Sequence, residues 1–345
     1  MIIFLALLFI LILTSVKIDS RTVVAANSIL QTQTIKGIFI ITIFFSHFCS
    51  YVHLEQWYDV PMRIYCSFLG QLMVTLFLFY SGFGIFESVK NKGVGYVKAF
   101  PQKRILKTLL HFDFAIILFL ILDFITGIPV SILEFSQALI AWLSIGNSAW
   151  FIFAILCSYI IAFLGFIVFK RNLNQSLIFI TIMTFLYIAI ISHFKASFWF
   201  DTILAFPLGC LLSLLKEKIN THLNRKFAFL VSGLSISVLT LTKTGFIPNI
   251  FISSQIALLT FSIALFFLST QFRLHSKILN WFGANVFGIY ILQRIPMNFF
   301  AHLHLNDYNI YLFFLVSFGS TLILSILFKK LTNFFDKIFL KIPQS

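Results

Sequence analysis

The sequence predicts one all-α membrane domain, a polytopic bundle of about 10–11 transmembrane helices, and three observations lead to this fold class. Hydrophobic residues make up 60% of the chain and charged residues only 10%, with a mean hydropathy of +1.00, whereas soluble domains carry about 25% charged residues. Apolar runs of roughly 20 residues, the length that crosses a bilayer core, recur from end to end. The runs do not alternate with polar residues, which excludes a membrane β-barrel.

Each of eleven runs is long and apolar enough to be a span. They cover residues 2–17, 35–53, 64–86, 105–124, 149–169, 175–193, 197–215, 227–243, 249–270, 280–300 and 310–328. The first run has no basic residue before it and is followed by its positive charges, so we expect an uncleaved span and not a signal peptide. The segments between runs are too short for a separate soluble domain.

The basic residues predict the orientation of the bundle. The chain has a formal net charge of +14, from 25 Lys and Arg against 11 Asp and Glu. With the N-terminus outside and the C-terminus cytoplasmic, the only basic residues in outward-facing segments are Arg63, Lys195, Lys243 and Arg294. This bias follows the positive-inside rule. The positive charge is therefore expected to face the cytoplasm and the head groups of membrane lipids. Nucleic acid is not expected as a partner.

The connecting segments divide the chain. Residues 87–104 are expected to be a cytoplasmic loop, because its glycines permit turns and Pro101 is tolerated where the next helix begins. The longest outer loop is expected near residues 125–148. The predicted divisions are an extra N-terminal span with a cytoplasmic linker (1–34), the main membrane domain (35–335) and a cytoplasmic tail (336–345).

His47 is the clearest candidate for chemistry. It follows Lys36 by eleven residues, in the outer half of an apolar span. An ionisable side chain inside a membrane segment is costly unless it is paired, so it indicates a functional site. Imidazole titrates near neutral pH, which suits a general base. The structural alternative is a histidine satisfied by a carbonyl or hydroxyl group of a neighbouring helix.

Arg104 and Lys107 form a second candidate site at the start of the span at 105–124. They lie one turn apart and face the same way. A cationic pair at a membrane entrance can hold the phosphates of a cytosolic donor. Ordinary basic flanking is the alternative, and for Lys103 beside them it is the favoured interpretation.

The same span carries further polar residues. His111 lies one turn after Lys107 and extends the polar stripe into the membrane, followed by Asp113 and by Asp123 near the outer end. A polar pair that joins two helices explains these residues equally well. No role is predicted for Glu87 or Asp201.

Two other segments combine polar, aromatic and small residues. Ser81 can hydrogen-bond across helices, while Gly82 and Gly84 beside it let backbones approach closely. Trp150 is typical of an aromatic residue at the membrane interface.

The C-terminal spans carry costly polar groups. Tyr290, Gln293 and Arg294 lie within or at the edge of a span, so we expect them to face a cavity. His302 and His304 resemble a metal-binding pair, but two histidines at i and i+2 are interpreted as plain loop residues. No metal site is predicted.

Together these segments resemble the family-3 acyltransferases, polytopic bacterial membrane proteins that O-acylate cell-surface sugars. The resemblance covers about residues 30 to 335. The matching motifs are Lys36, Gly37 and His47; Ser81, Gly82 and Phe83; Arg104 and Lys107; Trp150 and Phe151; Pro207 and Gly209; and Gly283, Ile289, Tyr290 and Gln293. The departures are Lys107 where Arg is usual, Leu110 where Pro often follows, Gln293 in place of a common His, and the additional first span.

The resemblance implies a membrane O-acyltransferase, most often an O-acetyltransferase, of the bacterial plasma membrane. It would move an acyl group from cytosolic acyl-CoA, a donor substrate and not a bound cofactor, to a hydroxyl of an extracytoplasmic or lipid-linked polysaccharide. His47 would be the general base or a transient acyl carrier. The implied donor-binding residues are Arg104, Lys107 and His111, and the implied acceptor or oxyanion residues are Ser81, Trp150, Tyr290 and Gln293. A separate extracytoplasmic transferase is a possible partner.

Two alternatives remain from the sequence. A secondary transporter would show interrupted spans in two matching halves, and no such symmetry is visible. A flippase or polymerase of surface polysaccharide would also be polytopic and basic inside. A polymerase would be expected to carry a large polar outer loop, whereas the longest outer loop here, at residues 125–148, is modest in length and largely apolar.

Overall fold

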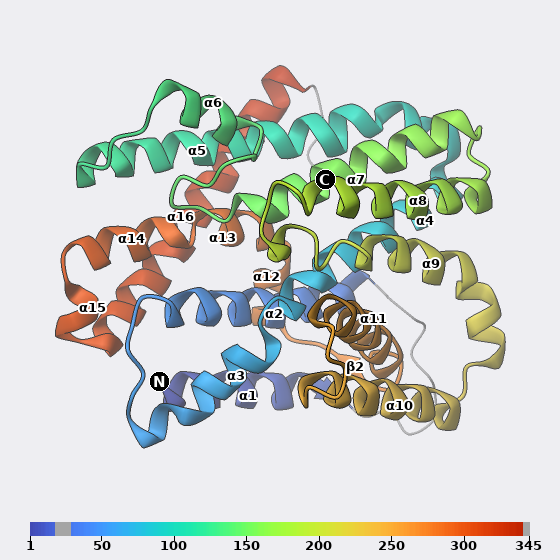
Figure 1. Ribbon diagram of the computed structural model, residues 1–345, viewed down its shortest axis with the longest axis horizontal. Coiled ribbons are helices and arrows are strands. Elements are labelled where there is room, and N and C mark those ends of the chain that lie inside the picture. Colours follow the sequence, from blue (N-terminus) through green and yellow to red (C-terminus); the bar gives the residue numbers. More distant parts are fainter. Residues whose placement is uncertain (18–28, 341–345) are drawn as a thin grey trace.

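The computed structural model describes residues 1–17 and 29–340, and in this part of the chain every long element is a helix. Figure 1 shows a bundle in which many of the helices lie side by side. Within the described residues, seven helical stretches are long and apolar enough to cross a membrane. The predicted all-α membrane fold is therefore confirmed.

The helices follow the expected runs in order. The long ones are α2 (Ile29–Cys49), α4 (Leu72–Phe100), α5 (Lys107–Thr126), α7 (Ala149–Val168), α8 (Leu173–Ile191), α9 (Ala205–His222), α10 (Arg225–Lys243), α11 (Ile250–Leu268) and α16 (Ile310–Phe339). The shorter ones are α1 (Ile2–Ser15), α3 (Val60–Leu69), α6 (Ile132–Leu139), α12 (Lys277–Ala284), α13 (Val286–Leu292), α14 (Arg294–His302) and α15 (Leu305–Tyr308). Short 3₁₀ turns cover Trp57–Asp59 and Ser197–Trp199.

The two ends of α1 identify the two faces of the bundle. At one face, the Met1 amino group donates hydrogen bonds to Asp59 Oδ1 (3.1 Å) and to the Tyr311 hydroxyl (3.2 Å). At the other, β1 (Val16–Lys17) pairs antiparallel with β2 (Arg273–Leu274). We call these the Met1 face and the Lys17 face.

The expected loop at residues 87–104 is helical, which corrects the sequence-based prediction. Helix α4 continues to Phe100, and a π-helical segment, Pro101–Leu106, leads directly into α5. The chain changes direction at Gly93, whose φ of +56° is accessible to glycine at low cost. Pro101 therefore precedes α5 by more than a turn and does not begin it. A kinked helix and a loop share the same glycine-rich composition, so local sequence did not distinguish them.

Two expected spans are interrupted. The run at 64–86 divides at Gly70 into α3 and α4. The run at 280–300 consists of α12, α13 and α14, which are separated at Asn285 and Gln293. Breaks of this kind are tolerated at membrane depth where the freed backbone groups are buried in protein or line a cavity.

Helices α2 and α12 touch backbone to backbone. A Cβ atom at Gly37 would collide with the carbonyl oxygen of Leu279, and a Cβ atom at Gly283 would collide with the carbonyl oxygen of Gln33. Small residues permit this approach, which stabilises helix pairs where lipid removes the hydrophobic driving force.

Helices α4 and α9 make the same reciprocal contact. A Cβ atom at Gly82 would collide with the carbonyl oxygen of Phe206, and one at Gly209 with that of Phe79. Gly82 thus has the close backbone contact that its neighbourhood predicts. Gly84 does not, because no atom lies within 4 Å of its Cβ position.

Glu87 joins the same two helices towards the Lys17 face. Its carboxylate accepts hydrogen bonds from Lys216 Nζ (2.7 Å) and Ser213 Oγ (2.8 Å) on α9 and from Lys90 Nζ (2.9 Å) on α4. The structure therefore gives Glu87, which had no predicted role, a place between helices.

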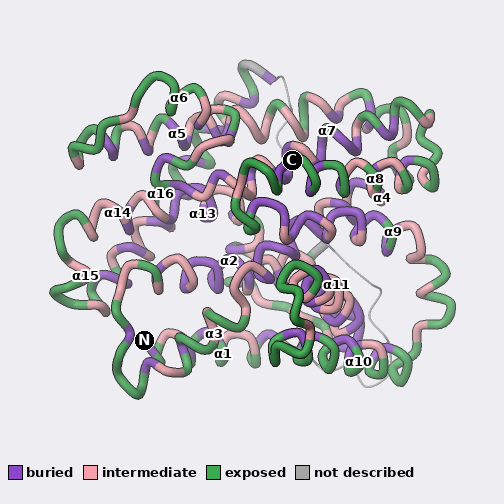
Figure 2. The backbone as a smooth tube through the Cα atoms, viewed as in Figure 1, coloured by how far each residue is buried: buried purple, intermediate pink, exposed green. Residues whose placement is uncertain are grey.

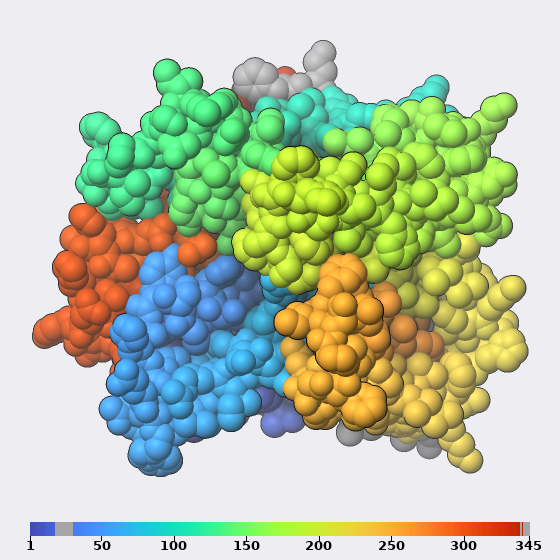
Figure 3. Space-filling model, in the orientation of Figure 1, coloured from blue at the N-terminus to red at the C-terminus, as the bar shows by residue number. Residues whose placement is uncertain are grey.

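The outward sides of the peripheral helices are apolar. On α8, Ile178, Ile182 and Phe185 are each more than half exposed and lie on one side of the helix. Figure 2 shows exposed residues along the rim, whereas much of α2 in the interior is buried. In Figure 3, side chains from segments far apart in sequence, coloured blue, green and orange, meet on one surface. Such apolar sides suit contact with lipid chains.

We expect Gly82→Ala to destabilise the protein, because the added methyl group would force α4 away from the backbone of α9. Overpacking of this kind costs about 1–3 kcal/mol. The measurement is the melting temperature of the purified protein in detergent. Gly84→Ala is the matched control on the same helix and should leave the melting temperature unchanged or slightly raised. Equal melting temperatures for the two variants would contradict the proposed backbone contact.

Candidate functional site

His47 lies in the last turn of α2, towards the Met1 face, and is half-buried. Its carbonyl oxygen accepts hydrogen bonds from the backbone N–H and the hydroxyl of Ser50 (3.0 and 2.6 Å). Within residues 1–17 and 29–340, no protein group hydrogen-bonds its imidazole. Among the described residues, no carbonyl or hydroxyl satisfies the ring, so both ring nitrogens can bind another molecule.

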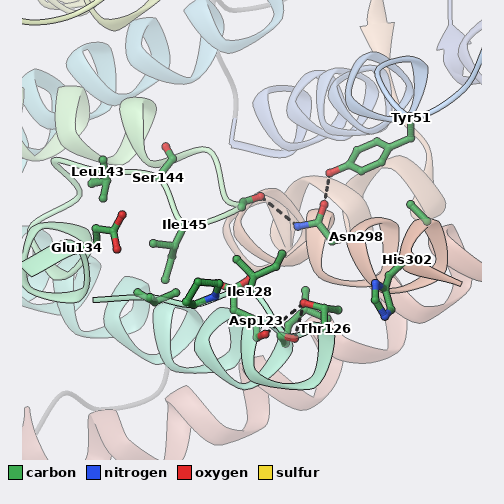
Figure 4. A pocket seen from close by; sticks show the side chains of 15 residues that line it. Tyr51, Asp123, Thr126, Ile128, Glu134, Leu143, Ser144, Ile145, Asn298 and His302 are labelled. Carbon is green, nitrogen blue, oxygen red and sulfur yellow. Dashed lines mark hydrogen bonds between the residues drawn. The ribbon is translucent and has the colours of Figure 1, made fainter. Parts of the chain in front are cut away.

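Arg294 is the charged neighbour of His47. The guanidinium acts electrostatically on the imidazole, and its Nε donates a hydrogen bond to the Tyr51 hydroxyl (3.1 Å). The Tyr51 hydroxyl in turn donates to Asn298 Oδ1, and Asn298 Nδ2 donates to the carbonyl oxygen of Gly146 (3.4 Å), as Figure 4 shows. A chain of polar contacts therefore runs from the surroundings of His47 to the loop before α7.

Tyr290 and Gln293 lie next to this chain on the interrupted helix. Tyr290 is buried, its hydroxyl donates to the carbonyl oxygen of Ser148 (3.4 Å), and Arg294 acts on it electrostatically. Gln293 is fully buried at the break between α13 and α14; its Nε2 donates to the Tyr290 carbonyl oxygen (3.2 Å). Its Oε1 has no partner among the described residues. That oxygen can accept a hydrogen bond from a bound molecule.

A second polar group lies towards the Lys17 face. Arg104 Nε donates to the Tyr96 hydroxyl (3.2 Å), and Tyr159 lies near the guanidinium. Lys36, which lies on α2, is close enough to Arg104 for the two positive charges to repel each other. Its Nζ lies 5.7 Å from the centre of the Tyr80 ring.

Neither cation of this group has an acidic partner. In the described part of the chain, no carboxylate lies within ion-pair distance of Lys36 or Arg104, and the buried Tyr80 hydroxyl has no hydrogen-bond partner. Two like charges in a half-buried setting are costly unless an anion joins them. The arrangement is suited to a bound phosphate.

Lys107 and His111 are occupied elsewhere. Lys107 Nζ lies 2.7 Å from Asp336 Oδ2, and His111 Nε2 lies 2.8 Å from Asp336 Oδ1. Both inner members of the predicted polar stripe therefore contact α16, whereas Arg104 contacts Tyr96 on α4. The side chain of Asp336 is only 7% exposed, and its two oxygens contact the Lys107 amine and the His111 ring.

Ser81 and Trp150 form no hydrogen bond with His47 in the described part of the chain. The Ser81 hydroxyl is half-buried, with no hydrogen bond to any described residue. Trp150 packs near Phe198, with ring centres 6.2 Å apart, while its neighbour Phe151 contacts the Tyr290 ring at 5.1 Å. The aromatic residue beside Tyr290 is therefore Phe151.

Sequence reasoning missed several residues of these groups. Asp336 is the only acidic residue of α16, and that isolation in an apolar helix was a usable signal. Tyr51 and Asn298 gave no such signal, because Tyr51 follows the end of α2 and Asn298 lies close to the end of an expected span, where polar residues are common. Their importance comes from tertiary contacts: Tyr51 accepts a hydrogen bond from Arg294, 243 positions away, and Asn298 accepts one from Tyr51.

The histidines near the end of α14 do not form a pair. His302 is the last residue of that helix, which corrects its assignment to a loop, and it lines a cavity. His304 follows in a turn and lies 3.5 Å from Asp307 with its side chain 85% exposed. Among the described residues, no three His, Cys, Asp or Glu side chains gather as metal ligands.

Comparison with known proteins identifies the family. A family model, Acyl_transf_3, described as an acyltransferase domain, matches residues 32–330. The chain belongs to the acyltransferase 3 family. The resemblance carried by the short motifs is thereby confirmed, and with it transferase activity in a multi-pass membrane protein. No curated protein and no solved structure matches the chain.

We expect Asp336→Asn to lower the thermal stability of this acyltransferase, because it leaves Lys107 and His111 without their shared partner. Hydrogen bonds to charged groups contribute about 1.5–3 kcal/mol each, and partial exposure of Lys107 reduces that figure. The check is a double-mutant cycle of Asp336→Asn with Lys107→Gln, read by thermal unfolding. The exposed Asp307→Asn serves as control. Additive effects of the two substitutions would show that the pair contributes nothing.

Proposed function

We propose that this acyltransferase is an O-acyltransferase, with acetyl as the favoured acyl group. It would move that group from cytosolic acyl-CoA to a hydroxyl of an extracytoplasmic or lipid-linked polysaccharide. The observation that carries the proposal is the arrangement on α2. Lys36 and His47 are eleven residues apart, which is close to three full helical turns, so they project from the same side about 16 Å apart along the axis. One end offers cations without an anion, and the other an imidazole without a partner.

The proposed donor site is the Lys36–Arg104 group. With the Lys17 face in the cytoplasm, as the positive-inside bias predicts, these cations face the compartment that contains acyl-CoA. Guanidinium and ammonium groups bind phosphate well. The pantetheine arm of coenzyme A separates its thioester from its phosphates, so the thioester can extend along α2 towards His47. Lys107 and His111 stay as predicted donor-binding residues, although Asp336 competes for both.

The proposed reaction at His47 is general-base catalysis. The sugar hydroxyl oxygen attacks the thioester carbonyl carbon while His47 accepts the hydroxyl proton. The tetrahedral intermediate collapses with cleavage of the carbon–sulfur bond, and His47 returns the proton to the leaving thiolate. We assign stabilisation of the oxyanion to Arg294, which acts electrostatically on His47, and to its neighbours Tyr290 and Gln293. A transient acyl group on His47 itself is the alternative route, with hydrolysis prevented by exclusion of water.

The competing functions lose support. A transporter, flippase or polymerase would not require the acyltransferase domain that covers most of the chain. We place the protein in a bacterial plasma membrane, with the Met1 face outside, where a separate extracytoplasmic transferase could act as a partner.

We expect His47→Ala to reduce turnover by about 10²–10⁴-fold, because a general base contributes that much. The assay is acyl transfer in proteoliposomes containing equal amounts of inserted protein. His53→Ala, which removes an exposed histidine near the Met1 face, is the matched control and should be normal. Normal turnover by the His47 variant would contradict the assignment.

The same variant tests the function in cells. The ester-acetyl content of the host's surface glycan is measured by NMR before and after mild base, in the intact strain, a gene deletion, and deletions complemented with wild type or His47→Ala. Loss on deletion, restored by wild type alone, is the expected result. Unchanged acylation on deletion would contradict transfer of acetyl to that glycan.

We expect Arg104→Ala to raise the KM for acetyl-CoA by about 10–100-fold, because a charge-assisted hydrogen bond to phosphate is lost. Steady-state kinetics with varied donor gives the value. Lys103→Ala removes an exposed adjacent cation and should change KM little. Equal increases in KM for the two variants would indicate that basic residues attract the donor non-specifically, which would contradict a specific phosphate site at Arg104.

A further inference from the structure

A cavity of about 550 Å³ opens at the Met1 face, beyond the end of α5. Its walls come from α5, α6, the loop at 143–146 and α14, as Figure 4 shows. The polar side chains in these walls are Tyr51, Asp123, Thr126, Glu134, Ser144, Asn298 and His302. Its volume lies within the range of about 300–1,000 Å³ that is common for small-molecule sites. The donor and base assignments above leave this cavity without a function.

Asp123 is the group in this cavity that most needs an explanation. The residue is 5% exposed, it lies near the end of α5, and it lines the cavity. Its backbone carbonyl accepts hydrogen bonds from Thr126 Oγ1 and from the N–H groups of Gly127 and Ile128. Among the described residues, its carboxylate has neither a hydrogen bond nor an ion pair. An unpaired carboxylate that borders a cavity is suited to accept hydrogen bonds from a ligand.

The charge of the cavity limits the class of ligand. Glu134 caps α6, and the backbone N–H and hydroxyl of Ser131 donate hydrogen bonds to its carboxylate (2.8 Å each), which hold its pKa below the usual value. No lysine or arginine belongs to the cavity walls. Two acidic side chains without a cation favour uncharged or amino-bearing ligands and oppose anionic ones.

The cavity is connected to the proposed catalytic base. Tyr51 and Asn298 line it, and both belong to the hydrogen-bonded chain that leads through Arg294 to the surroundings of His47. A polyhydroxyl ligand in the cavity therefore lies on the side of His47 opposite to the Lys36–Arg104 group.

We infer that this cavity binds the acceptor sugar, with Asp123 accepting hydrogen bonds from its hydroxyl groups, and that it selects neutral or amino sugars over acidic ones. This inference rests on the proposed function, because it assigns the acceptor of that reaction. Carboxylate and amide groups around a sugar-sized space, with hydroxyls from Tyr51 and Ser144, suit the many donors and acceptors of a pyranose ring.

Binding is measured without catalysis. Full-length protein in nanodiscs is mixed with methyl glucoside, methyl glucosaminide or methyl glucuronide, and saturation-transfer-difference NMR reports binding of each. Asp123→Asn is compared with Asp113→Asn, the same substitution on the same helix but outside the cavity. His302→Ala is compared with His304→Ala in the same way. Glu134→Gln removes the second acidic group of the cavity walls at an exposed position. Melting temperatures confirm that each variant is folded.

We expect signals from the glucoside and the glucosaminide, little from the glucuronide, and a loss of about threefold or more in Asp123→Asn alone of the two aspartate variants. His302→Ala should weaken the signals and His304→Ala should not. Glu134→Gln should strengthen the glucuronide signal relative to the glucoside. Equal signals from Asp123→Asn and Asp113→Asn, a glucuronide signal as strong as the others, or no signal from any glycoside would overturn the inference.

The outcome is separable from that of the proposed function. Sugar binding is observed without acyl-CoA, whereas the proposed function is tested by the ester content of the glycan and by turnover of His47→Ala. Loss of ester on deletion together with unaltered binding by Asp123→Asn would reject the cavity and retain the acyltransferase. Asp123-dependent binding without acyl transfer would reject the proposed reaction and retain the sugar site.

Discussion

Reciprocal glycine contacts between helix backbones are the constraint on which the site depends. Gly37 and Gly283 bring α2 against α12, and Gly82 and Gly209 bring α4 against α9. The first contact fixes the helix that carries His47 beside the segment that continues into Tyr290 and Arg294. In lipid, helix pairs cannot rely on exclusion of water, so close packing and interhelical hydrogen bonds must hold them. The positions of the candidate site residues on these helices therefore depend on glycines, which have no side chain to keep the backbones apart.

The polar residues are divided between the two halves of the bundle. Lys36 and Arg104 lie towards the Lys17 face without an anion, whereas His47, Arg294 and Tyr290 lie towards the Met1 face. Each group leaves charge or hydrogen-bonding capacity unused in the described structure, at a cost that a bound molecule would offset. A reaction that joins a donor from one side of a membrane to an acceptor on the other needs such a division.

Part of this site could be predicted from the sequence, because the cost of a polar group in an apolar run is a local property. His47, Gln293 and Arg294 became candidates in that way. The helical state of residues 87–104 was missed, since glycine permits a loop and a kinked helix equally. Gly82 and Gly84 look alike in sequence, yet only Gly82 faces another backbone. The interruption at Asn285 and Gln293 was missed because hydropathy is continuous across it.

Hydropathy by itself determined that this chain is an all-helical membrane protein, because the bilayer acts on each segment separately. Short motifs in order indicated the acyltransferase 3 family. Tertiary structure alone decided which polar groups meet. Asp336 pairs with Lys107 and His111 from the far end of the chain, and Asn298 meets Tyr51 across 247 positions. Such contacts depend on how helices pack against one another, and no local pattern records that.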